Sequence, residues 1–449
     1  MDDLRGPEGF FRREPALRAA APVGSSRFEA ILYPPLADIA RRNHVAFTVL
    51  FALAAFLGST FTFMLILLAG WALISLVLRR IPLVIGAPDM PVVLSCLGFV
   101  GLLSAIDFAQ NGGSALYAAA TLLLYILPAF QICRMRISDP DEVLPASFLG
   151  LAIGGVAIGL LSIGQHALGW QRVEGLMGNA GPLSVAALFA AGGAGLCLRA
   201  EGPRWRNLLA LAGLCGALAG LLLSGMRGTW FAAPPVAAAV LWARWGDLSR
   251  LWSALPPRHR VGIGVLALLV ALALVVLVLP SVSERARHFD SDLQALMAGN
   301  GDGPTSLSLR WEIYWAGLAA FADAPIVGYG FSRVWAAIVP HFDTATFASF
   351  SYSHLHNIVL TIAVAGGLFG VAALFALLFA PLATAILWRH RGSASEARDR
   401  IAFAIVLVCA FLIPGLTNLS ITHDVLDGIW ILAAPTIAAS VPLSRKRAW

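Results

Sequence analysis

Long apolar runs recur along this chain and restrict it to one class of fold. A helix needs about 20 consecutive apolar residues to cross the hydrocarbon core of a bilayer. Only 12% of the residues are charged, against roughly a quarter in soluble globular domains, and the mean hydropathy is +0.79. The sequence therefore predicts an all-α polytopic membrane protein with about twelve transmembrane helices. The predicted spans are 44–59, 61–78, 91–106, 114–132, 146–164, 180–198, 207–224, 229–243, 262–280, 356–379, 401–416 and 425–442.

Arginine positions predict how these spans are oriented. When the spans are alternated across the membrane, most arginines fall on one face, which the positive-inside rule makes cytoplasmic. Both termini fall on this face, and Lys446 is the only lysine in a chain whose net charge is +6. No basic patch interleaved with aromatic residues suggests a nucleic-acid partner. The arginines that support the assignment are Arg41, Arg42, Arg79, Arg80, Arg134, Arg136, Arg199, Arg204, Arg206, those from Arg244 to Arg260, those from Arg389 to Arg400, Arg445 and Arg447.

This alternation divides the chain into five predicted segments. They are a cytoplasmic N-terminal tail at 1–43, spans one to nine at 44–280, a periplasmic loop at 281–355, spans ten to twelve at 356–442, and a cytoplasmic tail at 443–449. The first tail alternates arginines with acids and lacks an apolar core, so we do not interpret it as a signal peptide.

The long periplasmic loop separates spans nine and ten and contains a predicted helix, from Leu307 to Ala322. Trp311, Trp315 and Leu318 recur there at helical spacing. The segment Asp323-Ala-Pro325 ends the pattern, because proline cannot continue a helix. We therefore expect a compact, partly helical cap on the outer face.

Arginines on the predicted outer face run against the positive-inside rule and are candidates for binding an anion. Arg227 lies in Ser224-Gly-Met-Arg-Gly-Thr229, a turn between two apolar spans. A guanidinium can bind two phosphate oxygens at once and keeps its proton. Alternatively, Arg227 contacts lipid headgroups. Arg310 opens the loop helix, where the alternative is an ion pair with Glu312 or Asp302.

Three further outer-face arginines have simpler explanations. Arg172 lies close to an acid, Glu174, with which it can pair instead of with substrate. Arg285 and Arg287 follow a predicted helix end, where both can meet lipid phosphates. We retain Arg172, together with Trp315 of the loop helix, as substrate-binding candidates.

The stretch Ser351-Tyr-Ser-His-Leu-His-Asn357 lies at the mouth of span ten, where a polar site would meet the membrane. An imidazole titrates near neutral pH, so His356 can take a proton from a sugar hydroxyl. We expect His354 and Asn357, beside it, to contact substrate. Alternatively, His356 is an ordinary helix-start histidine that bonds to loop backbone.

Metal binding has less support in the sequence. His354 and His356 can each ligate a metal, but no third ligand stands out. Asp290-Ser-Asp292 matches the Asp-x-Asp motif of nucleotide-sugar glycosyltransferases, yet so short a motif often arises by chance in a polar loop. The five cysteines show no CxxC and no spacing suited to zinc. We therefore predict that the protein needs no metal and no cofactor.

Five motifs, in their order along the chain, resemble the bacterial O-antigen ligase and polymerase superfamily. They are Gly178-Asn179 entering a span, the turn from Ser224 to Gly228, the helix from Arg310 to Trp315, Pro325-Ile-Val-Gly-Tyr-Gly330, and His356-Asn357 followed by Gly367 and Gly370. The last motif is most like the O-antigen ligase branch. The resemblance covers roughly residues 165–382 and is silent over the first third of the chain.

The resemblance implies a glycosyltransferase in the bacterial inner membrane, with its active site facing the periplasm. Such an enzyme moves a glycan from undecaprenyl diphosphate to an acceptor sugar on lipid A–core, by an inverting and metal-independent transfer. The family's paired arginines, which bind the diphosphate, carry over to Arg227 and Arg310. Its histidine, which activates the acceptor hydroxyl, carries over to His356. The superfamily also contains polysaccharide polymerases, which is the alternative function.

A twelve-span secondary transporter is the rival from another class of protein. Transporters of that size usually show related halves, with substrate groups at mid-membrane depth. Here the two halves show no internal repeat, and the polar candidates gather at one predicted surface. The sequence therefore favours the transferase.

Overall fold

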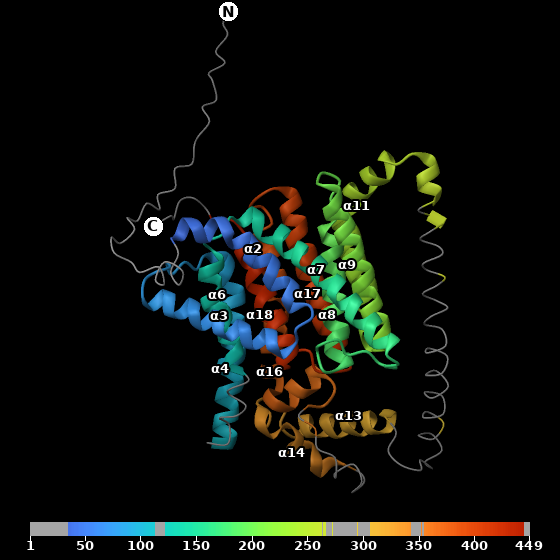
Figure 1. Ribbon diagram of the computed structural model, residues 1–449. Coiled ribbons are helices and arrows are strands. Elements are labelled where there is room, and N and C mark those ends of the chain that lie inside the picture. Colours follow the sequence, from blue (N-terminus) through green and yellow to red (C-terminus); the bar gives the residue numbers. More distant parts are fainter. Residues whose placement is uncertain are drawn as a thin grey trace, which may run out of the picture.

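The computed structural model describes residues 35–112, 122–262, 306–342 and 354–443, together with positions 264, 265, 272, 294 and 352. All regular structure in these residues is helical, which confirms the predicted all-α class. Figure 1 shows most of the helices packed in one bundle, with a smaller helical layer across one of its ends.

The helices (α) and short 3₁₀ helices (η) are as follows. The bundle contains α2 (Leu36–Ala54), α3 (Ser59–Val77), η1 (Ala87–Asp89), α4 (Met90–Asn111), η3 (Leu123–Ile126), α6 (Leu127–Met135), α7 (Pro140–Ala167), α8 (Ala180–Cys197), α9 (Arg204–Leu223), α10 (Arg227–Trp230), α11 (Ala233–Ala254), α16 (Ile358–Leu387), α17 (Ala394–Gly415) and α18 (Asp424–Ala439). The layer at its end contains α13 (Ser306–Asp323), η4 (Phe331–Arg333), α14 (Val334–Ile338) and η5 (Val339–His341).

Six segments in the described part are long and apolar enough to cross a membrane. They are Ser59–Val77, Ala87–Asn111, Pro140–Ala167, Ala180–Cys197, Arg204–Leu223 and Ile358–Leu387. The other predicted spans are not supported in this way, because α2, α11 and α17 carry several charged residues and α18 has 16 residues. The predicted span 262–280 lies almost wholly outside the described residues. The twelve-span count therefore stays a prediction.

Several helices extend further than the predicted spans. α2 begins at Leu36, inside the predicted N-terminal tail, and α11 continues to Ala254. α17 begins at Ala394, where Ser393 caps it by accepting a hydrogen bond from the Glu396 backbone N–H. Charged residues assigned to loops by hydropathy thus lie on helices that continue past the apolar run.

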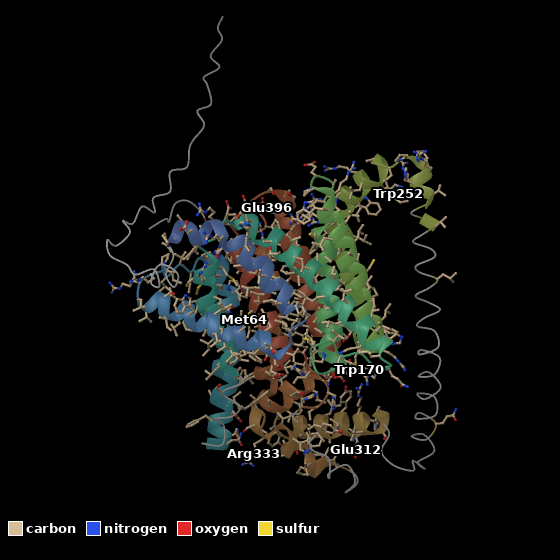
Figure 2. All side chains as sticks on the ribbon, viewed as in Figure 1. Met64, Trp170, Trp252, Glu312, Arg333 and Glu396 are labelled. Atoms are coloured by element: carbon tan, nitrogen blue, oxygen red, sulfur yellow. The ribbon has the colours of Figure 1, made fainter. Side chains whose placement is uncertain are left out.

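The predicted loop helix is confirmed, since α13 runs from Ser306 to Asp323. Figure 2 shows Glu312 of this helix at the same end of the molecule as Trp170, which lies in the connection between α7 and α8. Glu396 and Trp252, from predicted cytoplasmic segments, lie at the opposite end. The alternation of the other segments between these two ends stays a prediction, as does the end that faces the periplasm.

Some arginines that the sequence assigns to the cytoplasmic face are buried in ion pairs. The Arg136 Nη2–Asp89 Oδ1 distance is 2.6 Å, with 3% and 0% of the two side chains exposed. Asp399 of α17 bonds both Arg199 and Arg244, so it joins three parts of the bundle. Removing one partner of such a pair leaves an uncompensated buried charge. Loss of either partner would therefore destabilise the fold, so these arginines have a structural role.

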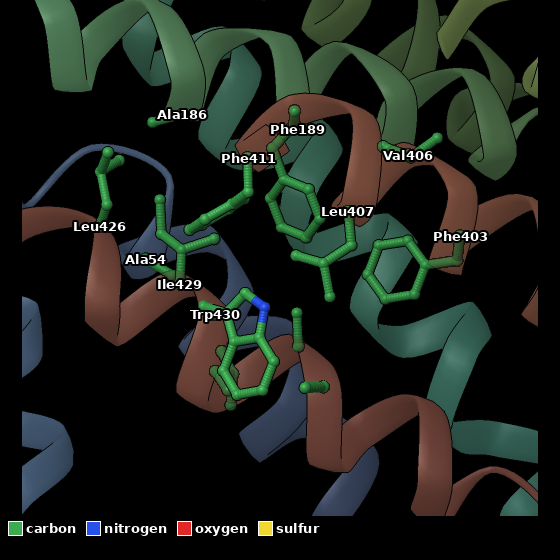
Figure 3. Close-up of a cluster of buried hydrophobic side chains, with 14 of the residues drawn as sticks. Ala54, Ala186, Phe189, Phe403, Val406, Leu407, Phe411, Leu426, Ile429 and Trp430 are labelled. Atoms are coloured by element: carbon green, nitrogen blue, oxygen red, sulfur yellow. The ribbon is translucent and has the colours of Figure 1, made fainter. Parts of the chain in front are cut away.

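The core lies around α8, whose 18 residues are all buried. Phe189 of α8 stacks on Phe403 of α17 with ring centroids 5.4 Å apart, and Trp430 of α18 is fully buried nearby (Figure 3). α7 and α9 approach still more closely, because a Cβ added at Gly155 would lie 2.3 Å from the carbonyl oxygen of Gly213. Small residues at such crossings let helices pack backbone against backbone in a membrane.

Candidate functional site

A break in α16 positions the candidate site. Gly367 has φ +59° inside this helix, which interrupts the hydrogen bonds of its backbone. The segment Pro325–Gly330 fills the gap, since the carbonyl oxygen of Pro325 accepts from Leu368 N at 2.8 Å. A Cβ on Gly367 would lie 2.2 Å from the carbonyl carbon of Ile326. Gly367 therefore lets the turn at Ile326 approach the backbone of α16.

Polar residues at the end of α4 hold the other side of this segment. Asp107 is 1% exposed, and its Oδ1 accepts from the Ser332 N and Oγ at 3.0 and 2.8 Å. Asn111 Nδ2 donates to the Tyr329 carbonyl oxygen at 3.0 Å. Sequence reasoning missed both residues, although a carboxylate at the end of an otherwise apolar run was a usable signal. The first third of the chain thus helps to position the cap.

His356 lies just before α16, in a backbone conformation with φ +52° that few non-glycine residues adopt. Asn357 caps α16, since its Oδ1 accepts from the Leu360 N at 3.1 Å. The hydroxyl of Tyr314, on α13, donates to the His356 carbonyl oxygen at 2.9 Å. The helix cap on one side and α13 on the other therefore fix the histidine.

The imidazoles of this region are held neutral by their surroundings. Burial lowers the pKa of His356, and the positive charge of Arg310 lowers it further. Burial, with the neighbouring His356 and His423, lowers the pKa of His354 to about 4. The rings of His354 and His356 meet edge to face, with centroids 4.7 Å apart. The structure thus brings Arg310 and His354 close to His356 and Asn357.

Arg227 begins α10 and lies on the same surface as a second arginine. The turn before it uses Gly225 at φ +67°. Within the described residues Arg227 has no acidic partner, and its side chain is half-buried. Arg172 Nη2 donates to Met226 Sδ at 2.9 Å, so Arg172 meets the turn that carries Arg227. The two outer-face arginines at this turn are therefore neighbours.

The connection from α17 to α18, residues 416–423, links the two groups. A Cβ on Gly228 would lie 2.2 Å from Thr417 Oγ1, which places the start of this loop against the Arg227 turn. A Cβ on Gly415 would lie 2.8 Å from Ile358, at the start of α16. His423, at the end of the loop, lies close enough to His354 to lower its pKa. This loop, which none of the five sequence motifs includes, bridges the histidines and the Arg227 turn.

Comparison with known families decides the class of protein. Residues 211–375 match the family described as O-Antigen ligase. This match supports the O-antigen ligase and polymerase superfamily over about a third of the chain. The matched O-antigen ligase region contains Arg227, Arg310, His356 and the helix break at Gly367. No curated protein matches the chain.

The match to the O-antigen ligase family supports enzyme activity of the ligase or polymerase kind. It indicates a bacterial membrane protein of lipopolysaccharide biosynthesis, with a lipid-linked glycan and an acceptor as substrates. Arg172 and the 416–423 loop lie outside the matched region, although both contact the Arg227 turn. The surface described above therefore extends beyond the O-antigen ligase domain.

The other residues that the sequence singled out are not part of this cluster. Trp315 is 60% exposed and stacks parallel on Trp311 with centroids 6.5 Å apart, on the face of α13 opposite buried Ile313. Within the described residues no cluster of three metal-ligating side chains occurs. Asp290-Ser-Asp292, Arg285 and Arg287 lie outside the described residues.

Proposed function

We propose that this protein transfers a glycan from undecaprenyl diphosphate to an acceptor sugar on lipid A–core, without a metal ion and with inversion at the transferred carbon. The observation that supports it is Arg310 beside His356, which puts a permanent cation next to a neutral imidazole. Such a pair can bind a diphosphate and accept a proton in the same place. The match to the O-antigen ligase family supports the same chemistry.

The reaction needs one proton acceptor and a stabilised leaving group. In the proposed step, the acceptor hydroxyl oxygen attacks the anomeric carbon of the donor sugar while its proton passes to the His356 imidazole. The bond between that carbon and the phosphate oxygen breaks, and its electron pair leaves with undecaprenyl diphosphate. Arginines placed before the reaction stabilise this developing charge more than the ground state.

Arg227 and Arg310 are the proposed diphosphate ligands, with Arg172 at the edge of the site. Arg227 is half-buried and free of acidic partners among the described residues, so its guanidinium is available to an anion. Arg172 is exposed and already contacts Met226, which suits a supporting role. His354, Asn357 and Trp315 complete the proposed substrate-binding set.

Donor binding is expected to activate the base. In the free protein the charge of Arg310 lowers the pKa of His356. A bound diphosphate compensates that charge, so the His356 pKa rises when the donor arrives. The imidazole then becomes a stronger base only when there is a sugar to transfer.

We place the protein in the bacterial inner membrane, with this surface facing the periplasm and both termini in the cytoplasm. Lipid-linked donors enter a site at the membrane surface, and six segments are suited to crossing the bilayer. The arginine distribution along the sequence supports this orientation.

The experiment that tests the function is the glycan content of cells that lack the protein. Loss of a ligase leaves polymerised glycan on undecaprenyl diphosphate and bare lipid A–core. Loss of a polymerase, the alternative in the same superfamily, leaves single repeat units, some of them transferred. We expect an electrophoretic ladder of carrier-linked chains. A single-repeat product would favour the polymerase, and unchanged glycans would exclude both.

A further inference from the structure

A small pocket lies beside the turn that carries Arg227. It is enclosed by the N-terminal turn of α8, by α10, and by the end of α17 with the loop that follows. Met226 and Thr229, the residues on either side of Arg227-Gly228, both line it. The pocket has room for a group about the size of one water molecule. Any anion held by Arg227 would therefore lie close to its mouth.

One wall of this pocket is polar and contains a hydroxyl without a partner. Ser420 is 1% exposed, and its Oγ has no hydrogen-bond partner in the part of the chain that the structure describes. Such groups are rare, since burying a hydroxyl without a hydrogen-bond partner is unfavourable. Because Ser420 lines the pocket, its hydroxyl is available to a ligand there.

Two further polar side chains lie at the half-buried edge of the pocket. Thr417 packs on Gly228, and the amide of Asn418 covers Gly181, where an added Cβ would lie 2.6 Å from Nδ2. Gly181 itself is fixed, since its N–H donates to the cap residue Asn179 at 2.8 Å. Gly181, two residues after the Gly178-Asn179 motif, thus leaves room for the Asn418 amide, and both residues line the pocket.

The remaining walls are apolar, from Val185, Pro414 and Leu419. A sugar presents both kinds of surface, with hydroxyl groups at its edge and C–H bonds on its faces. Pockets that bind such ligands combine apolar walls with a few fixed polar groups. We propose that this pocket receives one hydroxyl group of the donor sugar that is bonded to the diphosphate, with Ser420 and Asn418 as its hydrogen-bond partners. This inference rests on the proposed function.

The pocket would then select the donor. A site built to hydrogen-bond a substrate hydroxyl rejects the analogue that lacks it, because its own polar groups are left without partners. The relevant probes are undecaprenyl diphosphates that carry one sugar, intact or lacking a single hydroxyl at each position in turn. We expect one of these deoxy donors to be transferred at least about 10-fold more slowly than the intact donor by the wild-type protein.

The decisive test is whether that loss depends on Ser420. Ser420→Ala should lower kcat/KM for the intact donor by about 3- to 10-fold and lower it no further for the sensitive deoxy donor. Ser162→Ala is the matched control, because Ser162 Oγ is also buried without a partner among the described residues but lies outside the pocket. It should transfer every donor like the wild type.

Several results would overturn the inference. If Ser420→Ala slows all donors equally, Ser420 has only a structural role, and if it slows none, the pocket holds a trapped water only. A separate measurement, the affinity for undecaprenyl diphosphate without a sugar, distinguishes failure of the proposed function from failure of the pocket inference. Arg227→Lys should weaken that binding, whereas Ser420→Ala should leave it unchanged. If Arg227→Lys binds undecaprenyl diphosphate as tightly as the wild type, the proposed function is contradicted. The inference about the pocket, which rests on that function, would then be wrong as well.

Discussion

His356 occupies a left-handed backbone conformation because three neighbours determine it. Asn357 must cap α16, Tyr314 holds the His356 carbonyl oxygen, and Thr361 Oγ1 accepts from the Leu355 N at 3.1 Å. Strain of this kind costs about 1–3 kcal/mol and persists only where the surroundings enforce it. The cap thus fixes where the imidazole points before any substrate is bound.

The pH dependence of transfer should report the charge beside His356. The base acts when neutral, so activity falls as the pH drops through its pKa. Burial and Arg310 lower that pKa in the free protein, and we expect kcat/KM for the donor to persist below pH 6.5, the ordinary histidine value. In the donor complex the diphosphate offsets Arg310, so the acid limb of kcat should lie at higher pH than the limb of kcat/KM.

These profiles can be measured with purified protein between about pH 4.5 and 8.5, around the ordinary histidine pKa. His341→Gln is the control, because His341 also lies in the cap but beside Asp323. His356→Ala should lose about 10²- to 10⁴-fold in rate while still binding undecaprenyl diphosphate. If the acid limbs of the kcat and kcat/KM profiles lie at the same pH, the donor does not neutralise the charge of Arg310.

At the scale of elements, the α16 break and the Pro325–Gly330 segment act as one unit. Gly367 supplies the positive φ, and the segment supplies partners for the backbone groups that the break exposes. Gly328, at φ +70°, meets the Val364 carbonyl oxygen from the other side. Two glycine motifs separated by some 40 residues in the chain are thus one contact in space.

Gly367→Ala should separate these two segments. The new methyl would lie 2.2 Å from the Ile326 backbone, and alanine disfavours positive φ, so we expect a loss of about 1–3 kcal/mol in stability. Transfer should fall sharply, because the cap carries Arg310 and Tyr314. Thermal melting in detergent and turnover measure the two effects. Gly98→Ala, with no atom within 4 Å of the new methyl, is the control, and equal behaviour of the two variants would refute the coupling.

Sequence patterns predicted these elements where the determining signal was local. Helical spacing and Asp323-Ala-Pro325 located α13 to within a residue at each end. The hydrophobic runs did not show the full extent of α11 and α17, because the buried ion pair Arg244–Asp399 lets these helices continue with charges inside the fold. The roles of Asp107 and Thr417 depend on tertiary contacts, which no local pattern encodes.

At the scale of the whole molecule, the proposed function requires that the end of the bundle that carries α13 face the periplasm. Three of the arginines that predict the orientation are engaged in ion pairs, namely Arg136, Arg199 and Arg244. Because their position is explained by the fold, they give less support to the positive-inside assignment than the exposed arginines do. The exposed arginines still favour the same face: Arg204, Arg258 and Arg389 belong to it. The proposed site, on α13 and the 416–423 loop, then lies on the periplasmic side of the membrane.

Cysteine labelling in spheroplasts tests this orientation directly. A cysteine at Ala322, exposed on α13, should react with a membrane-impermeant maleimide, whereas one at Ser393, exposed before α17, should react only after permeabilisation. The five native cysteines are unpaired, and Cys215 is exposed along α9, so the parent protein without an added cysteine is the control. Labelling of Ser393→Cys alone would put Arg310 and His356 in the cytoplasm. A periplasmic lipid A–core acceptor would then be out of reach, and the proposed function would have to be abandoned.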